Sequence, residues 1–135
     1  MEFRLSMDSA LSMIFIASSI YRFAKSTVLL NTGKFGECIA ICKELIAEND
    51  SLADAYYNLG LAYFTQAIEL DKKSQHSRAV HRKIRELYEK SRPYMERYRS
   101  LAPQRQRKWR PVLYTIYLNL NMGEEFDEIN KLRMR

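Results

Sequence analysis

The chain has 135 residues, 47% of them hydrophobic, with only four Gly and three Pro. This composition argues against a disordered chain and for one packed helical domain, long enough to bury a core. The formal net charge is +6, but the first seventy residues carry five basic and eight acidic side chains, so the positive excess lies in the second half. The two cysteines, Cys38 and Cys42, are one helical turn apart, too few and too close for a disulfide framework, and are expected to be buried reduced thiols.

An apolar run at residues 10–17 lies near the start of the chain. Such a run is also typical of a signal peptide, but Arg4 is the only basic residue before it, and the run is too short to span a bilayer. We favour a helix over Asp8–Leu30, capped by Asp8 or Ser9, and no transmembrane segment. Apolar residues at alternating steps of four and three predict its inward stripe: Ala10, Ile14, Ala17, Tyr21, Ala24 and Val28.

A stop signal at residues 31–33, whose glycine suits the left-handed position, precedes a second helix predicted over Phe35–Asn49. A third helix begins near Ala53. No Gly or Pro lies between residues 61 and 92, so this helix and the next are expected to form one long hairpin. Its predicted tip is the polar stretch Asp71–Arg78.

Pro93 lies within the second arm of that hairpin, where it should remove a backbone hydrogen bond and kink the helix. A basic connection over Leu101–Arg110 follows. The next helix is predicted over Pro111–Asn121, because proline favours the first helical turn, with Trp109 packed just outside it. The last helix is predicted over Glu124–Arg133, with acidic residues at its start and basic residues at its end, as the helix dipole favours.

One stretch of the third helix resembles a known family. Tyr56, the pair Leu59 and Gly60, and Tyr63 are spaced as in the tetratricopeptide repeat pattern W-x2-L-G-x2-Y, with Tyr in place of Trp. In that pattern Gly60 would be the small position where the partner helix approaches the backbone. The resemblance covers about residues 33–135, and the long hairpin exceeds the family's period by roughly 19 residues.

The resemblance implies an all-α fold of stacked antiparallel helical hairpins, a TPR-like superhelix of about six helices. A single domain over residues 1–135 is expected, with hairpins at about 8–50, 53–102 and 111–133. Repeats of this family bind extended peptides or helices in a groove formed by the first helix of each hairpin. The implied function is therefore a scaffold for protein binding.

The groove residues that the resemblance implies are Tyr57, Asn58, Leu61, Phe64, Thr65, Tyr114, Tyr117 and Asn121. Ordinary packing between neighbouring hairpins is the alternative role for the tyrosines. Asn58 falls where some family members use Asn to hold the terminal carboxylate of a peptide. Phe23 and Thr27 stand where the matching residues of the preceding repeat would be, so that carboxylate clamp is not expected.

No residue pattern in the chain predicts catalysis. A pair of carboxylates, a Ser, His and Asp set, and a Gly-rich phosphate loop are all missing from suitable contexts. Cys38 and Cys42 would need His76 and His81 to complete a metal site, and these histidines belong to the tip of another hairpin. We expect no enzyme activity, no metal and no cofactor.

Positive charge is concentrated in residues 72–110, which hold fourteen basic and three acidic side chains. Nucleic-acid or polyanion binding through this segment is the alternative function, because cations beside an aromatic residue are typical of single-stranded nucleic-acid binders. The patch concerned is Arg105, Arg107, Lys108, Trp109 and Arg110. The simpler interpretation is a solvated charged face, with Trp109 in the core.

The expected partner is a protein or peptide. Because a stack of few repeats leaves its end faces uncovered, self-association through the N-terminal helix, or membership of a longer repeat protein, is a further expectation. Four bulky residues off the main stripe of that helix support self-association: Met7, Met13, Ile16 and Ile20. Reduced cysteines favour the cytoplasm, with the bacterial cell envelope as the alternative.

Overall fold

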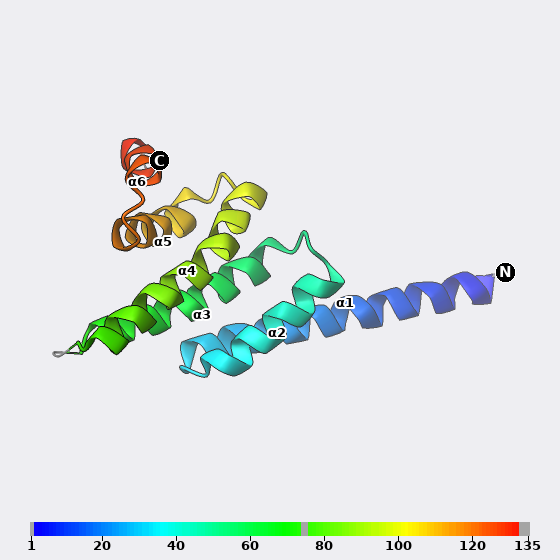
Figure 1. The fold of residues 1–135 in the computed structure, drawn as a ribbon. Helices are drawn as coiled ribbons and strands as arrows, with labels where there is room; N and C mark the ends of the chain where they lie inside the picture. The colour runs from blue at the N-terminus through cyan, green and yellow to red at the C-terminus, as the bar shows by residue number, and fades with distance from the viewer. Residues whose placement is uncertain (1, 74–75, 133–135) are drawn as a thin grey trace.

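The computed structural model describes residues 2–73 and 76–132, with side chains from Met7 onward. Six helices and no strand occur in these residues, so the predicted all-α fold of helical hairpins is confirmed (Figure 1). The helices are α1 Glu2–Asn31, α2 Phe35–Glu48, α3 Ala53–Asp71, α4 Arg78–Leu101, α5 Gln106–Asn119 and α6 Gly123–Lys131.

Each helix packs against the next one in the chain, which produces three antiparallel hairpins. In addition, α1 contacts α3 and α3 contacts α5, so alternate helices lie along one side of the stack. The middle hairpin is long, as predicted, because α3 has 19 residues and α4 has 24, whereas α2 has 14. Its tip falls within Asp71–Arg78, of which residues 74–75 lie outside the described chain, as does Arg133, the predicted end of the last helix.

Two turns close by the same backbone motif. Gly33 has φ 78°, Lys34 N donates to the Leu29 carbonyl at 2.8 Å, and Gly33 N donates to the Leu30 carbonyl at 3.2 Å. This is a Schellman ending, in which a left-handed residue satisfies the last helical carbonyls. Asn121, with φ 56°, takes the same place after α5, at the predicted end of the helix over Pro111–Asn121.

The α4 helix begins at a capped residue and continues past Pro93, and the kink predicted there stays a prediction. Ser77 caps it, because its Oγ accepts a 3.2 Å hydrogen bond from Val80 N. Pro93 lies inside the helix with its ring exposed, and the helix extends to Leu101. Because the proline is exposed, its ring and the backbone carbonyl that lacks an N–H partner both lie on the solvent side of the helix, away from the core.

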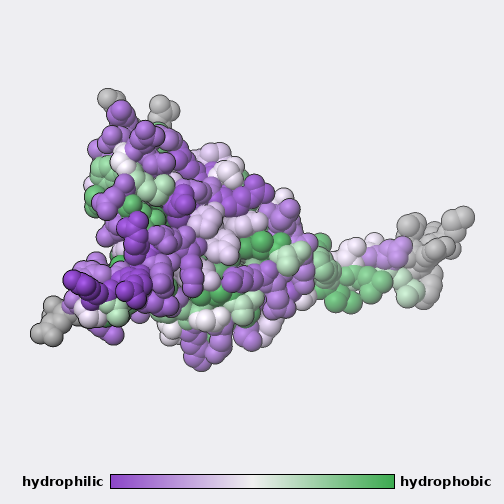
Figure 2. Space-filling view, in the orientation of Figure 1, coloured by the Kyte–Doolittle hydropathy of each residue, from purple (hydrophilic) through white to green (hydrophobic). Residues whose placement is uncertain are grey.

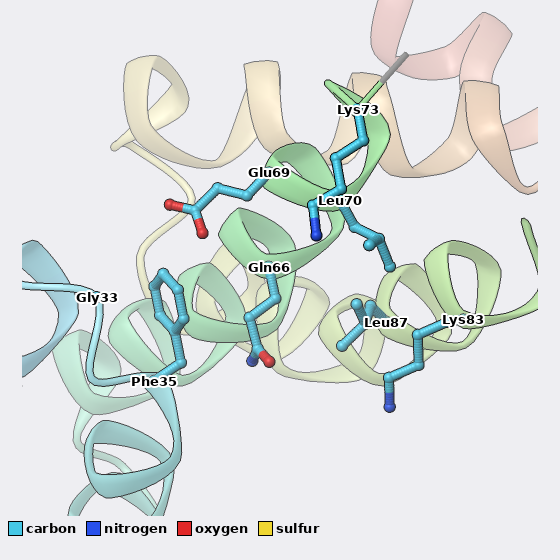
Figure 3. Close-up of a pocket in the computed structure, with 8 residues that line it drawn as sticks. All are labelled: Gly33, Phe35, Gln66, Glu69, Leu70, Lys73, Lys83 and Leu87. Atoms are coloured by element: carbon cyan, nitrogen blue, oxygen red, sulfur yellow. The ribbon is translucent and has the colours of Figure 1, made fainter. Parts of the chain in front are cut away.

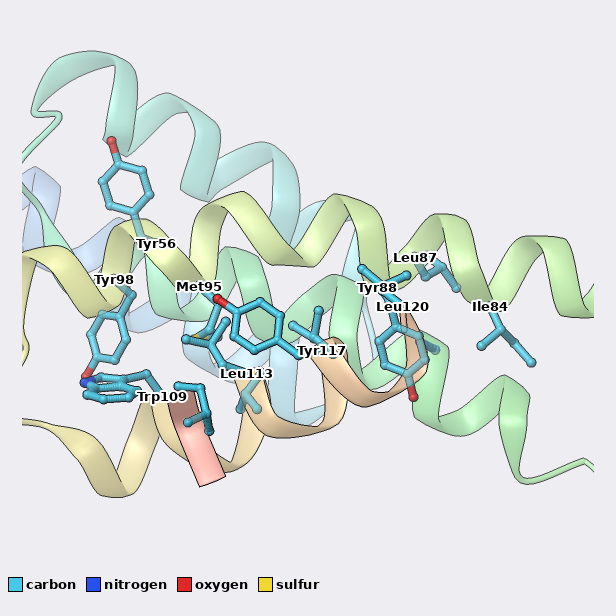
Figure 4. Close-up of a cluster of buried hydrophobic side chains, with 14 of the residues drawn as sticks. Tyr56, Ile84, Leu87, Tyr88, Met95, Tyr98, Trp109, Leu113, Tyr117 and Leu120 are labelled. Atoms are coloured by element: carbon cyan, nitrogen blue, oxygen red, sulfur yellow. The ribbon is translucent and has the colours of Figure 1, made fainter. Parts of the chain in front are cut away.

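The larger core lies where α3, α4, α5 and α6 meet. Figure 4 shows Met95, Leu113 and Tyr117 between α4 and α5. A Cβ on Gly60 would lie 2.8 Å from Met95 Cε, and Ser91 Oγ donates to the Gly60 carbonyl at 2.7 Å. The close helix approach predicted at Gly60 is therefore present, between α3 and α4.

A smaller core joins α1, α2 and α3. It is built from Leu29, Cys38, Cys42, Leu59 and Ala62, all buried. Both cysteines are free and buried, as expected. The hydrogen bond with Cys42, together with burial, raises the pKa of the Cys38 thiol, so that thiol stays protonated and unreactive at neutral pH.

The predicted inward stripe of α1 is wrong. All six of its residues are exposed, and the face that packs on α2 and α3 is the opposite one, which carries Arg22, Ser26 and Leu29. Arg22 contributes a charged anchor there, donating from both terminal nitrogens to the carboxylate of Glu48. A search for apolar periodicity does not detect such a contact, because the residue that makes it is charged.

Much of α1 also has no partner helix. Its 30 residues extend about 45 Å, whereas the 14 residues of α2 cover about 21 Å. The N-terminal half of α1 therefore projects from the body of the molecule, and its surface there is largely hydrophobic (Figures 1 and 2). By length and composition alone, Met7–Asn31 could cross a membrane, with a mean hydropathy of 1.3. The expectation of no transmembrane segment stays a prediction.

The predicted start of α5 at Pro111 is also wrong, because α5 begins at Gln106. Trp109 is 2% exposed within this first stretch and its Nε1 donates to the Ala102 carbonyl at 3.3 Å. Burying an indole contributes on the order of 4 kcal/mol, which offsets the roughly 3 kcal/mol that a proline costs inside a helix. The tertiary contact of Trp109 thus overrides the local preference of Pro111.

Candidate functional site: a groove on alternate helices

A surface hollow of about 480 Å³ lies between α1, α3 and the start of α5. We call it the odd-helix groove. Its lining from α1 is Phe23, Thr27, Leu30 and Asn31; from α3, Asp54, Tyr57, Asn58 and Leu61; and from the start of α5, Arg105 and Lys108. The volume is within the range of about 300–1,000 Å³ that is usual for ligand sites.

Helical spacing explains why these side chains share one surface. Residues three and four apart lie on the same face of a helix, which is the spacing of Asp54, Tyr57, Asn58 and Leu61 on α3. Because α1, α3 and α5 are alternate members of the stack, their corresponding faces open on the same side. The hairpin order therefore collects residues that are more than eighty positions apart in the sequence.

The floor of the groove is aromatic and aliphatic. Tyr57 is half-buried, with its ring centroid 4.8 Å from that of Tyr98. Burial, reinforced by Tyr98, raises the pKa of Tyr57, so its hydroxyl stays neutral and remains a hydrogen-bond donor. Leu61 and Phe23 are also half-buried, leaving part of each apolar side chain open to a ligand.

One edge of the groove is cationic. Lys108 Nζ lies 5.2 Å from the ring centroid of Tyr57, within the range of a cation–π contact. Arg105 Nη1 pairs with Asp54 Oδ1 at 2.6 Å, and both side chains are 42% exposed. The edge thus has two positive groups and one negative group, which gives it an excess of positive charge.

Asn58 has a structural role in this groove. It is 5% exposed, and its Nδ2 donates to Ser26 Oγ at 2.9 Å and to Thr27 Oγ1 at 3.0 Å. Ser26 in turn donates to the Phe23 carbonyl at 2.6 Å. Both amide hydrogens of Asn58 are therefore used inside the protein, and neither is left for a carboxylate ligand.

The structure brings together only part of the predicted groove. Tyr57, Asn58 and Leu61 line it, whereas Phe64 packs toward Tyr88 with ring centroids 6.0 Å apart. Thr65 is half-buried on α3 and does not belong to the lining.

The predicted residues of α5 and its C-terminal turn lie elsewhere. Tyr114 packs on Phe126 of α6, with ring centroids 4.8 Å apart. Tyr117 is buried and its hydroxyl donates to Glu96 Oε1 at 2.8 Å; burial and this bond raise its pKa. Tyr117 and Asn121 line a separate hollow of about 250 Å³ at the α5–α6 turn.

The predicted basic patch is divided in the same way. Arg105, Arg107 and Lys108 are exposed and line a further hollow of about 440 Å³. Trp109 is buried beneath Arg99, whose guanidinium carbon is 4.6 Å from the indole ring centroid. Arg110 is half-buried and its Nε donates to the Ile129 carbonyl at 3.2 Å. Trp109 is therefore core and has no ring face for a base, which corrects its place in the patch.

Sequence reasoning missed the contribution of α1 and the position of the two cations. Phe23, Leu30 and Asn31 were not candidates, because the predicted stripe assigned the other face of α1 to the interior. Arg105 and Lys108 were assigned to a separate patch, although they border the same groove. Phe23, Thr27 and Leu30 recur at steps of four and three, so the sequence does hold a second, mixed candidate face of α1.

A different hollow, of about 410 Å³, separates the start of α2 from the projecting α3–α4 hairpin (Figure 3). Phe35 lines it on one side and Leu87 and Lys83 on the other, with Glu69 and Lys73 at its rim. None of its lining residues was a predicted site residue. Among the residues that the structure describes, no group of three or more His, Cys, Asp or Glu side chains is placed to hold a metal ion.

Comparisons of the chain with protein-family models, with curated proteins and with solved structures found no match.

Proposed function

We propose that this chain is a non-enzymatic interaction scaffold that binds an acidic peptide segment in the odd-helix groove. The observation that carries the proposal is the joint lining of the groove. Apolar and aromatic side chains from α1 and α3 form its floor, and Arg105 and Lys108 stand along one edge. The resemblance of Tyr56–Tyr63 to a tetratricopeptide repeat supports the same function, since that family binds peptides on the corresponding helices.

The chemistry of the groove favours a peptide with both apolar and acidic side chains. Half-buried Tyr57 and Leu61 offer apolar area, and burial of such area contributes about 25 cal/mol per Å². The cationic edge would attract carboxylates and raise the association rate. Both amide hydrogens of Asn58 are donated to Ser26 and Thr27. Recognition would therefore depend on side chains of the peptide rather than on its terminal carboxylate.

The test begins with a displayed peptide library selected against the full chain. We expect enrichment of sequences that place Asp or Glu beside Leu or an aromatic residue. A fluorescein-labelled selected peptide is then titrated by fluorescence anisotropy against the wild type and Lys108→Glu. Loss of the positive charge and gain of a negative one should weaken binding about tenfold, equivalent to 1.4 kcal/mol.

A matched control is Lys83→Glu, which makes the same charge change at an exposed lysine in the other hollow. It should leave the affinity unchanged. Tyr57→Ala should abolish binding, because it removes the aromatic floor of the groove, provided that circular dichroism shows an intact fold. Equal affinities for Lys108→Glu and Lys83→Glu, or no enrichment of any peptide, would reject the groove as the binding site.

Polyanion binding is the second candidate function. It is favoured because Arg105, Arg107 and Lys108 are all exposed and lie within about one helical turn of one another. Its signature is an affinity for a labelled single-stranded oligonucleotide that falls steeply between 50 and 200 mM salt, as phosphate contacts predict. Arg107→Glu should reduce that slope without affecting the selected peptide. An oligonucleotide that binds with little dependence on salt would remove this candidate.

A further inference from the structure

An exposed apolar stripe lies on the side of α1 that faces away from α2 and α3. Successive residues turn by about 100° around a helix axis, which places the stripe roughly opposite the packed residues Ser26 and Leu29. Its large members are open to solvent, with Ile14 66%, Tyr21 67% and Val28 60% exposed. The complete stripe alternates small and large residues: Ala10, Ile14, Ala17, Tyr21, Ala24 and Val28.

Two copies of this stripe are complementary in shape when the two helices run antiparallel. About a centre at the level of Ser19, Ala10 faces Val28, Ile14 faces Ala24, and Ala17 faces Tyr21. Every pair joins an alanine with a large side chain, so knobs on one helix meet gaps on the other. A twofold axis requires this kind of self-complementary surface. We propose that α1 pairs in antiparallel orientation with α1 of a second copy of this chain.

The shape of the molecule allows this pairing. The projecting half of each α1 would lie beside the docked half of the other, on the side that α2 and α3 leave open (Figure 1). The large exposed residues on and beside the stripe are Met7, Met13, Ile14, Ile20, Tyr21 and Val28. At on the order of 100 Å² each, these six side chains supply most of the roughly 800 Å² per partner of a standard interface.

Charge does not oppose the pairing. The stripe itself contains no charged residue, and Lys25 is the charged residue beside it. In the antiparallel register, the two Lys25 levels are about 18 Å apart along the axis, at 1.5 Å per residue. This separation exceeds the Debye length of about 8 Å at physiological ionic strength, so their repulsion is screened.

A lipid bilayer fits α1 less well than a second copy does. Arg22 is ion-paired with Glu48, and Ser26 and Leu29 are buried, so insertion of the whole candidate span would detach α1 from α2. The uncharged stretch of the free half, residues 9–21, is about 20 Å long, which is shorter than the roughly 30 Å of a bilayer core.

Sedimentation equilibrium of the full chain tests the proposal, with Ala17→Glu as the disrupting variant. Ala17 is exposed in the single chain, so this change leaves the fold intact while it buries a carboxylate in the paired state. We expect the wild type to be dimeric at micromolar concentrations and Ala17→Glu to dissociate at least tenfold more readily. The matched control is Phe15→Glu, because Phe15 is 55% exposed on the side of α1 away from the stripe and should leave the dimer unchanged.

Cross-linking tests the register and direction. Ala10→Cys mixed with Val28→Cys should be joined by a short bismaleimide, whereas Ala10→Cys alone should not, because its two copies would lie about 27 Å apart. A monomeric wild type, equal effects of Ala17→Glu and Phe15→Glu, or cross-linking of Ala10→Cys with itself would overturn the proposal. Flotation of monomeric wild type with phosphatidylcholine vesicles would overturn it in favour of lipid.

Discussion

At the scale of single residues, Asn58 links two helices of the groove through one buried amide. Its Nδ2 reaches Ser26 Oγ and Thr27 Oγ1, and Ser26 is completely buried. Removing one member of a buried hydrogen-bonded group leaves its partners without solvent or protein contacts, which costs more than the bond itself contributes. Asn58 thus stabilises the α1–α3 contact on which the groove depends.

Asn58→Ala should lower the free energy of unfolding by about 2–3 kcal/mol, because two hydroxyl groups lose a buried partner. Urea unfolding followed by circular dichroism measures this change. Asn119→Ala is the matched control, since Asn119 is exposed and donates to the Thr115 carbonyl of its own helix. A loss at Asn58 no larger than that of the control would show that the buried network is unimportant.

At the scale of helices, the ion pair between Arg22 and Glu48 joins α1 to α2. The hydrogen bond from Arg22 holds the pKa of the Glu48 carboxyl below its usual value. A carboxyl whose pKa is depressed on folding contributes stability above its unfolded pKa. That contribution is lost as the pH falls through the folded pKa. The contact is therefore expected to weaken only when the pH falls below the usual range of a glutamate carboxyl.

A double-mutant cycle with Arg22→Gln and Glu48→Gln should show a favourable coupling between the two residues at pH 7. The coupling should decrease steadily as the pH is lowered from 5 to 3, because protonated Glu48 no longer attracts Arg22. Urea unfolding at each pH measures the four free energies. A coupling that is the same at pH 7 and pH 3 would contradict an electrostatic origin.

At the scale of the whole molecule, stability is unevenly distributed. The core between α3, α4 and α5 is built from large buried side chains such as Tyr88, Met95 and Tyr98. Residues 9–17 of α1 are exposed on every side, so their helical hydrogen bonds have no tertiary support. An isolated helical stretch of this length is marginal in water. Opening of this half of α1 should therefore be independent of global unfolding.

Amide hydrogen exchange should show this difference directly. In dilute protein, amides of residues 9–17 should exchange at least a hundredfold faster than those around Leu59 and Met95. If α1 pairs with a second copy, protection of residues 9–17 should rise with protein concentration, while protection near Leu59 stays constant. Slow exchange in residues 9–17 at every concentration would show that this half is covered within a single chain.

Local chemistry in the sequence determined the number of helices, most of their ends and the hairpin order. Residues 31–33 end α1 because a left-handed glycine satisfies its last carbonyls, and the polar tip after Asp71 ends α3. Gly60 marked the close approach of α4 to α3, which the structure confirms at Met95. The groove was predictable only on α3, where Tyr57 and Leu61 lie off the stripe of Tyr56, Leu59 and Tyr63 that packs against neighbouring helices.

Only the tertiary structure decided which face of α1 is buried and where α5 begins. α1 has two candidate faces, and the one chosen depends on Glu48 and Asn58, which lie on other helices. The early start of α5 depends on the pocket that buries Trp109, and it places Arg105 and Lys108 beside Tyr57. Sequence periodicity reports contacts within one helix at steps of three and four residues. It cannot rank two faces whose burial depends on residues more than twenty positions away.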